Sequence, residues 1–417
     1  MFFLYALVYT LALFFAFPFE LKKRPREVRL DWLKEKLGFI PAEKIKNGAV
    51  WVHAVSVGET LAAMPFINAL KERGLDVIVS TITDTGQKVA RERVGAANVI
   101  YLPFDLQIFF RTAIKDLNPS AFVLVETELW PGAISMMKKS SVPVFIVNGR
   151  ISEKSFKNYF KVRFFMKMVL AGVSAICVQD ETYAMRAMEL GAPKERVRVT
   201  GNFKFDMRPR ETPPPPWTKG LGSPVLVAGS THKGEESLIA SALKNLKPDF
   251  PSLKAIFAPR HPERTEEVEG VLKAEGFTLK RSSELSDYKG ENLPDVVLVD
   301  TVGELFQVYS AADVAIVGGS FIPHGGQNPL EPAYWGKAII SGLHMENFPF
   351  MEELVKEGGA KCVPADALYR ELKGLLMDED LRVLMGKKAR EFYKRRAGAV
   401  SKTLSIFLEE VFPTGGI

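Results

Sequence analysis

Apolar and polar positions alternate in two long series along the chain, and each series predicts a parallel α/β domain. Short apolar runs predict buried strands, and segments with helical spacing, such as 61–73 and 129–139, lie between them. The predicted strands cover 49–55, 76–82, 121–125, 142–147 and 175–178 in the first series, and 224–228, 254–258, 296–300, 313–317 and 337–341 in the second. Because alternating strands and helices build doubly wound parallel sheets, we expect two Rossmann-like domains.

A run of four prolines in TPPPP at 212–216 separates the two series. Consecutive prolines form a stiff, extended spacer. We therefore expect a first Rossmann-like domain over 21–211, a linker over 212–220 and a second Rossmann-like domain over 221–393. A helical pattern over 381–411 closes the chain, and we expect 394–417 to form a C-terminal helix that packs back toward the first domain.

The first 19 residues contain no charged side chain, and as a helix they are just long enough to cross a bilayer core. We interpret 1–20 as a single-pass membrane anchor, a transmembrane helix. A cleavable signal peptide would need a basic start and a small-residue cleavage site, and this segment has neither. Basic residues follow the segment directly, at Lys22, Lys23, Arg24, Arg26 and Arg29. They predict that the protein body stays in the cytoplasm. A helix lying flat on the membrane is the alternative, because Pro18 and the short length allow it.

Charge is distributed unevenly over the 417 residues. Residues 1–211 hold 31 Lys and Arg against 21 Asp and Glu, a net charge of +10, and the remainder has a net charge of −4. The basic first half predicts an anionic partner, either nucleic acid or lipid phosphate, with a merely solvated basic face as the alternative. Two isolated cysteines indicate no disulfide framework and no zinc site, and they fit a reducing compartment.

The stretch VGGSFIPHGGQNPLEP at 317–332 follows a predicted strand and holds two pairs of glycines. Glycine pairs let a ligand approach the backbone closely. Asn328 is a candidate cap, Pro329 suits the first helical position, and Glu331 lies in the first turn. The pattern predicts a phosphate-and-ribose site at a helix start, and a tight turn without a ligand is the alternative.

Two further predicted strands end in acidic turns. In WVHAVSVGET at 51–60, Glu59 opens a helix and could accept a proton from an attacking hydroxyl group. The helix N-terminus would lower the pKa of Glu59, closure that excludes water would raise it, and a purely helix-stabilising role is the alternative. In ETELWP at 126–131, Glu126 and Glu128 could bind a sugar or serve a structural role.

The second half offers three more strand-end turns, AGSTHKGE at 228–235, APRHPER at 258–264 and DTVGEL at 300–305. Arg260 presents a planar, charged fork that suits phosphate. The five histidines lie near these turns without metal-ligand spacing, so we interpret them as polar lining. The segment 154–170, KSFKNYFKVRFFMKMVL, is basic and aromatic, which fits either a membrane surface or core packing with extended lysines.

Nine motifs in fixed order, HAVSVGE, ETELWPG, NGRIS, GNFKFD, AGSTHKGEE, APRHPER, GEL, VGGSF and HGGQNPLEP, resemble those of the Kdo transferases of lipid A biosynthesis. The resemblance runs from about Trp51 to Glu346. It implies the GT-B architecture, with two facing Rossmann-like domains. It also implies transfer of 3-deoxy-D-manno-octulosonic acid (Kdo) from CMP-Kdo to a lipid A precursor, with inversion and with no metal or other cofactor.

The resemblance also assigns residues. Glu59 matches the general base of the family. The CMP-binding positions are Pro259, Arg260, Val302 (commonly Met in the family), Gly303, Glu304, Asn328, Pro329, Leu330 and Glu331. Arg150 and Lys233 are our candidates for holding the Kdo carboxylate.

The expected partners are the CMP-Kdo donor, the lipid A precursor (lipid IVA) and the lipid of the cell inner membrane, with the catalytic domains on the cytoplasmic side. We expect no nucleic-acid partner, because short motifs that read DNA or RNA are missing. Two other hypotheses stay open. One is a soluble nucleotide-sugar epimerase, against which the apolar amino end argues. The other is a non-catalytic, membrane-attached binder of nucleotides or nucleic acid.

Overall fold

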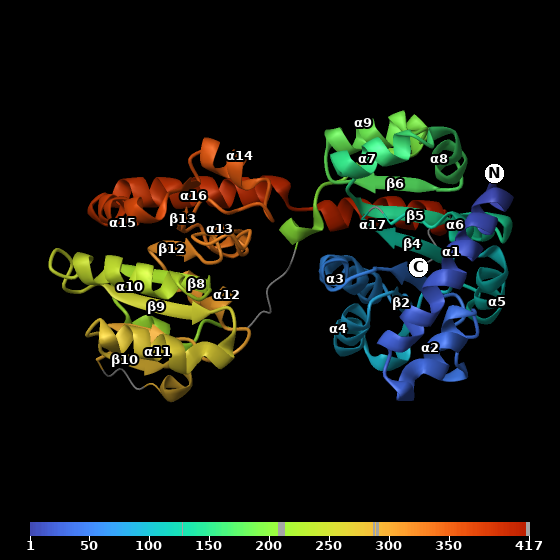
Figure 1. Cartoon of the computed structure of the whole chain (residues 1–417). Helices are drawn as coiled ribbons and strands as arrows, with labels where there is room; N and C mark the ends of the chain where they lie inside the picture. The colour runs from blue at the N-terminus through green and yellow to red at the C-terminus, as the bar shows by residue number, and fades with distance from the viewer. Residues whose placement is uncertain (127, 207–212, 287, 289–291, 414–417) are drawn as a thin grey trace. The chain divides into compact units, whose positions relative to one another are not determined.

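The computed structural model describes residues 1–126, 128–206, 213–286, 288 and 292–413. The chain divides into two compact units (Figure 1). Unit 1 comprises Met1–Arg208 together with Arg396–Ile417, and unit 2 comprises Pro209–Arg395. Position 212 of the predicted linker lies outside the described residues, and Pro216–Gly220 forms a short 3-10 helix.

In the described part of unit 1, a parallel sheet has the strand order β3-β2-β1-β4-β5-β6-β7. Its strands are β1 Val50–His53, β2 Val77–Thr81, β3 Val99–Tyr101, β4 Ala121–Val125, β5 Val144–Gly149, β6 Ala175–Val178 and β7 Val197–Val199. Its helices are α1 Phe2–Lys23, α2 Arg29–Lys36, α3 Val57–Glu72, α4 Asp84–Val94, α5 Gln107–Leu117, α6 Pro131–Lys139, α7 Glu153–Phe160, α8 Arg163–Leu170, α9 Glu181–Glu189 and α17 Ala399–Val411.

Unit 2 repeats the arrangement with the strand order β10-β11-β9-β8-β12-β13-β14 in its described residues, again all parallel. Its strands are β8 Val225–Thr231, β9 Lys254–Pro259, β10 Leu279–Arg281, β11 Val296–Leu298, β12 Val314–Val317, β13 Ala338–Ser341 and β14 Ala360–Cys362. Its helices are α10 Glu235–Leu246, α11 Thr265–Ala274, α12 Leu305–Val308, α13 Leu330–Tyr334, α14 Met351–Lys356, α15 Leu368–Met377 and α16 Glu379–Arg396. Two parallel-sheet α/β units confirm the predicted fold class.

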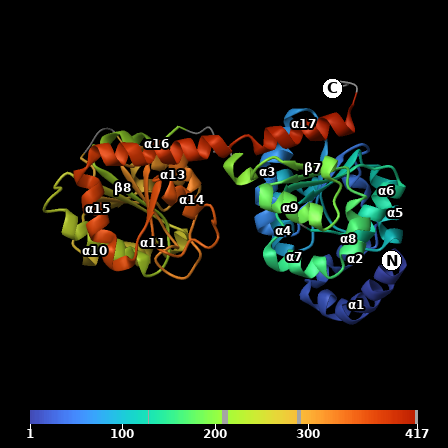
Figure 2. The ribbon, with the colours of Figure 1, turned by 90° about the horizontal axis from the view of Figure 1, so that it is seen from above.

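Each central strand is buried on both faces, which explains the continuous apolar runs in the sequence. In β1, Trp51 packs into the cluster on one face, whereas Val50 and Val52 pack into the cluster on the other. Helix α17 completes the second cluster beside α3 (Figure 2), where the ring of Phe407 contacts those of Phe66 and Phe145. The final segment of the chain therefore belongs to the core of unit 1.

The predicted helix over 381–411 is two helices. Helix α16 ends at Arg396 and α17 begins at Ala399. Between them Gly398 has a φ of +96°, a left-handed conformation that interrupts an α-helix. The backbone N–H of Gly398 donates to the carboxylate of Asp206.

Candidate active site

In unit 1, the predicted base lies where the central strands end. Strands β1, β4 and β5 are neighbours and parallel, so the residues after them gather at one edge of the sheet. Glu59 lies in the first turn of α3, directly after β1. Its Oε2 accepts from the backbone N–H of Val55 at 2.6 Å, and its Oε1 accepts from the hydroxyl of Ser56 at 3.2 Å. These bonds hold the carboxylate back against the strand end.

The surroundings of Glu59 make it a stronger base than an ordinary glutamate. Burial raises its pKa to about 7, and the negative charges of Glu128 and Glu126 add to the effect against the hydrogen bonds from Val55 and Ser56. The sequence predicted two opposing effects on this pKa, a lowering by the helix N-terminus and a rise on closure that excludes water. In the structure, burial and the two neighbouring carboxylates outweigh the hydrogen bonds at the helix start.

Two cationic side chains, those of Arg150 and Lys204, lie near Glu126. Burial raises the pKa of Glu126, and the positive charges of Arg150 and Lys204 oppose that rise. Two asparagine contacts fix the loops concerned: Asn148 Oδ1 accepts from the backbone N–H of Phe203 at 3.0 Å, and Asn202 Oδ1 accepts from that of Lys204 at 2.9 Å. The edge thus carries three carboxylates beside two cations, a polar arrangement suited to a sugar with both hydroxyl and anionic groups.

In unit 2, a single carboxylate organises the glycine-rich loop after β12. Glu235 is 1% exposed and accepts from the backbone N–H groups of His232, Gly319, Ser320 and Phe321 at 2.6–3.0 Å. Glu235 belongs to the motif AGSTHKGE, and no role was predicted for it from the sequence. The available signal was an acid in the first turn of a helix that follows a strand.

The loop also requires glycine for steric reasons. A Cβ atom at Gly318 would lie 2.4 Å from the backbone oxygen of Ser230. The end of β8 and the loop after β12 therefore touch at this point, with no room for a side chain.

The NPLE segment lies beside Arg260 but builds a shorter helix than expected. Helix α13 has five residues, and Pro329 precedes it instead of occupying its first position. Asn328 Oδ1 accepts from the N–H of Leu330 at 3.1 Å, and its amide donates to Glu331 at 3.2 Å. Burial raises the pKa of Glu331 to about 7, against the hydrogen bond from Asn328 and the positive charge of Arg260. Near neutral pH, Glu331 can both donate to and accept from hydroxyl groups.

The third predicted nucleotide segment, Val302 to Glu304, precedes α12. Gly303 has a φ of +96°, and the side chain of Val302 is 86% exposed. Buried polar atoms of this turn, Thr301 Oγ1 and Glu304 Oε2, have no hydrogen-bond partner in the described part of the chain. Trp335 Nε1 donates to the backbone oxygen of Phe306 at 2.7 Å, which joins the turn's helix to α13. The turn thus offers unused polar atoms next to the NPLE segment.

The histidines separate into two environments. The ring of His232 lies 4.1 Å from that of His324 and 5.8 Å from that of His261, and its Nε2 lies 3.0 Å from Gln327 Nε2. Burial and the neighbouring positive groups lower the pKa of His232 to about 4. His53, in contrast, is completely buried and interacts with Ser80, so it is a core residue and not an accessible lining. In the described ranges, no three His, Cys, Asp or Glu side chains are grouped as for a metal ion.

The two candidates for the Kdo carboxylate belong to different units. Arg150 follows β5 in unit 1 and interacts with Glu126, as described above. Lys233 lies in the turn before α10 of unit 2, is largely exposed, and has its amine 3.6 Å from Glu267.

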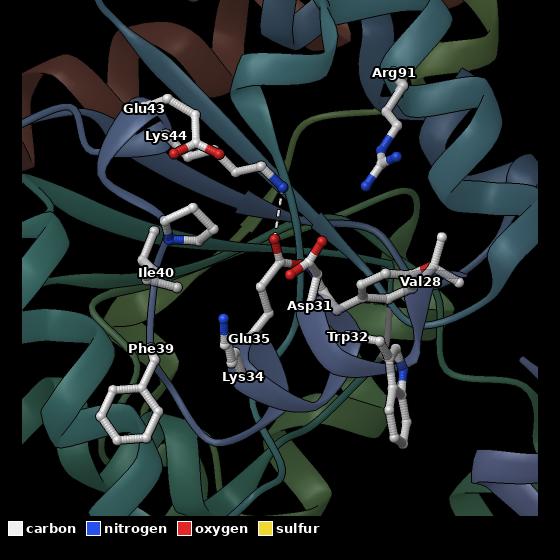
Figure 3. A pocket seen from close by; sticks show the side chains of 12 residues that line it. Val28, Asp31, Trp32, Lys34, Glu35, Phe39, Ile40, Glu43, Lys44 and Arg91 are labelled. Carbon is white, nitrogen blue, oxygen red and sulfur yellow. Dashed lines mark hydrogen bonds and ion pairs between the residues drawn. The ribbon is translucent and has the colours of Figure 1, made fainter. Parts of the chain in front are cut away.

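A separate cavity of about 420 Å³ lies between α2 and the segment that follows it (Figure 3). Figure 3 shows Lys44 directed at Glu35, with which it forms an ion pair of 2.6 Å. The other Glu35 oxygen accepts from the N–H of Tyr101 at 2.8 Å. None of the predicted site residues lines this cavity.

Comparisons with solved structures support the fold class. The MurG protein of Acinetobacter baumannii matches 87% of this chain and 100% of its own, with a TM-score of 0.54 at 14% identity. A UDP-N-acetylglucosamine 2-epimerase from Neisseria meningitidis matches with the same TM-score and coverage at 12% identity. At these identities the likeness shows the fold alone, and the fold is GT-B, as predicted.

Sequence comparisons give the family. Residues 31–207 match the family model of the 3-deoxy-D-manno-octulosonic-acid transferases (kdotransferase). The 3-deoxy-D-manno-octulosonic acid transferases of Haemophilus influenzae and Bordetella pertussis are each 34% identical over 370 residues. The match covers 86% and 85% of this chain and 86% of each relative. The chain belongs to the Kdo transferase family and is a glycosyltransferase, which confirms the resemblance carried by the nine motifs.

Proposed function

We propose that this protein transfers Kdo from CMP-Kdo to the lipid A precursor lipid IVA, with inversion at the anomeric carbon, and that Glu59 is the general base. The observation that carries this proposal is the raised pKa of the Glu59 carboxyl group. It is a strand-end carboxylate whose pKa burial raises to about 7, beside the side chains of Glu126 and Glu128. A base that titrates near the working pH is both deprotonated and basic enough to accept a proton.

The reaction is a single displacement. The acceptor hydroxyl oxygen forms a bond to the anomeric carbon of Kdo as its proton passes to Glu59. The bond from that carbon to the phosphate oxygen breaks, and CMP departs with the electron pair. Because one displacement occurs, the configuration of the carbon inverts.

Unit 2 supplies the donor site in this proposal. Arg260 faces the CMP phosphate, Glu331 and Asn328 bind the ribose hydroxyl groups, and the turn from Val302 to Glu304 contacts the rest of the nucleotide. Support comes from the buried Glu331 beside Arg260 and from the unpartnered Glu304 Oε2. Pro259, Gly303, Pro329 and Leu330 shape the backbone around these groups. The guanidinium of Arg260 and backbone N–H groups would stabilise the developing phosphate charge, so we propose a reaction without a metal ion.

The basic residues of unit 1 support the choice of acceptor, because lipid A precursors are anionic and membrane-bound. Helix α1 is long and apolar enough to cross a membrane. The basic residues after it favour attachment to the cell inner membrane with both units on the cytoplasmic side.

The test uses purified protein, CMP-Kdo and a tetraacyl lipid A precursor, with the product identified by its mass. We expect Glu59→Gln to lower kcat about 100-fold or more, because a positioned base typically contributes at least that factor. The matched control is Glu92→Gln, which changes an exposed glutamate on α4 of the same unit. Near-normal turnover by a folded Glu59→Gln protein would refute the role of Glu59. Absence of any Kdo adduct with the wild type would refute the acceptor.

A further inference from the structure

We propose that α1 lies in the plane of the membrane surface instead of crossing the bilayer. Its outward side and the exposed apolar side chains of α7 and α8 would dock together on an anionic lipid leaflet. The inference rests on the membrane attachment proposed above but not on the sugar transfer, so the two can fail separately.

One side of α1 contacts unit 1 along the whole helix. The residues on that side recur every three or four positions, as one side of a helix requires. They are Phe2, Tyr5, Tyr9, Leu13, Phe17 and Leu21, of which all but Tyr5 pack on the two apolar clusters next to α1, and Tyr5 bonds to Asp105. Since 22 residues extend about 33 Å, this contact is as long as a bilayer core is thick.

Hydrogen bonds secure the first half of the helix. The hydroxyl of Tyr5 donates to Asp105 Oδ2 at 2.6 Å, and the hydroxyl of Tyr9 accepts from the backbone N–H of Asp105 at 3.1 Å. Asp105 is fully buried and also accepts from the N–H groups of Gly132 and Ala133 at the start of α6. Moving α1 away would deprive this buried carboxylate of a partner and uncover it, which is costly.

The second half is secured by aromatic and charged contacts. The ring of Phe17 lies 6.3 Å from that of Trp32 and 6.4 Å from that of Phe104. Directly after the helix, Arg24 is buried, lies 5.0 Å over the ring of Trp32 and pairs with Asp84 at 3.2 Å. A helix that crossed the bilayer would have to lose these contacts from its first turn to its last. Otherwise the polar surface of unit 1 beside the helix would have to enter the bilayer core.

The outward side of α1 is apolar and faces away from the body of unit 1. Its exposed large side chains are Phe3, Leu4, Leu7, Val8, Leu11, Phe14, Phe15 and Phe19. A continuous exposed apolar surface of this kind marks a membrane or protein contact. An interfacial helix embeds such a side about 5–10 Å below the headgroups.

Helix α8 extends this surface beside the first turns of α1 (Figure 2). The ring of Phe165 lies 5.6 Å from that of Tyr5 and 5.5 Å from that of Phe2. The exposed apolar side chains of this region are Phe160, Val162, Phe164 and Met168. The guanidinium of Arg163 lies 5.2 Å and 5.4 Å from the ring centres of Phe160 and Phe164.

Positive charge favours lipid over a second protein as the occupant. Five basic residues lie along α7 and α8 near the start of α1, at Lys154, Lys157, Lys161, Arg163 and Lys167. Three more lie at the other end of α1, with Lys22 and Lys23 in its last turn and Arg26 shortly after it. A helix in the membrane plane places both of its ends, and both basic groups, at the level of anionic headgroups.

The first test asks on which side the N-terminus lies. A short cysteine-containing extension is placed before Met1 in a Cys362→Ser background, in which the remaining Cys177 is buried. The protein is bound to the outside of sealed phosphatidylethanolamine vesicles containing about a quarter phosphatidylglycerol. We expect a membrane-impermeant maleimide to label the extension in intact vesicles as fast as it labels a Glu92→Cys control. Labelling of the extension only after detergent is added would overturn the proposal.

The second test measures depth with nitroxide labels on Leu4→Cys, Leu11→Cys and Phe19→Cys, from their relative exposure to oxygen and to a polar nickel complex. An in-plane helix gives similar shallow depths at all three positions. A maximum at Leu11 with shallow values at Leu4 and Phe19 would contradict it. Failure to bind the vesicles combined with self-association of the chain would also contradict it, and would assign the surface to a second copy.

Discussion

Replacing Glu128 by Gln should move the acid limb of the pH–rate profile to lower pH. Burial, Glu128 and Glu126 together raise the pKa of Glu59 from 4.5 to about 7, against the hydrogen bonds from Val55 and Ser56. Because burial is the largest cause of the rise, removing the charge of Glu128 should reverse only a minor part of it. The uncharged amide keeps the size of the side chain and removes this repulsion.

The expected effect changes sign with pH. Well below the pKa of Glu59, the fraction of deprotonated base should rise about 3- to 10-fold, and kcat/KM should rise with it. Above about pH 8 the base is already deprotonated in both proteins. There the variant should be slower by less than about 3-fold, because a less basic carboxylate accepts a proton less readily.

The assay is kcat/KM for Kdo transfer from about pH 5 to pH 9, with Glu92→Gln as the control for a charge change far from the strand ends. A loss of acceptor binding alone would lower kcat/KM at every pH without shifting the acid limb of the profile. A limb that stays in place, or moves to higher pH, would refute the view that Glu128 raises the pKa of Glu59.

Three further predictions concern unit 2. Arg260→Lys should raise KM for CMP-Kdo about 10-fold with a smaller change in kcat, because an ammonium group cannot reproduce a bidentate phosphate contact. Steady-state kinetics would check this prediction, and an unchanged KM would contradict it. Glu331→Gln should flatten the dependence of stability on pH, seen in thermal unfolding. Because the pKa of Glu331 is raised in the folded state, folded wild-type protein binds more protons than the unfolded chain between pH 4.5 and about 7. Its free energy of unfolding therefore falls by up to about 3 kcal/mol as the pH rises through this range. Glu235→Ala should destabilise the protein by about 3 kcal/mol or more, because four backbone N–H groups lose their acceptor, and an unaltered Tm would refute this.

The sequence predicted every strand in the middle of the two sheets and missed the strands at their edges. The four missed strands, β3, β7, β10 and β14, have three residues each and lie at the ends of the strand orders. A central strand is buried on both faces and reads as an apolar run, whereas β7 and β10 are partly exposed and show no such run. Edge strands depend on pairing with a neighbour, which a local pattern does not reveal.

The site was predicted as a set of strand ends but not in its electrostatics. Glu59, Arg260 and the NPLE segment were placed correctly after their strands, because parallel strands all present their carboxyl ends at one edge. The sign of the pKa shift of Glu59 was not predictable, since it depends on burial and on Glu126 and Glu128, which approach from another strand. Helix α13 is short because Gly336, two residues after its end, has a φ of +68°, a left-handed conformation that stops an α-helix.

The two units place a glutamate at equivalent positions and use it in opposite ways. Glu59 follows β1 and Glu235 follows β8. Each of these strands is the first of its sheet along the chain, pairs with a strand on either side, and leads into a helix that begins with the glutamate turn. Both side chains fold back onto the backbone of the preceding turn, to Val55 and to His232. Glu235 then receives three more N–H groups and is fully buried, so its oxygens are occupied by the loop that they organise. Glu59 receives one N–H group and one hydroxyl group, beside two repelling carboxylates, and therefore keeps a capacity to bind a proton. The number of N–H groups that each carboxylate accepts thus separates a glutamate that holds a loop from one that can act as a base.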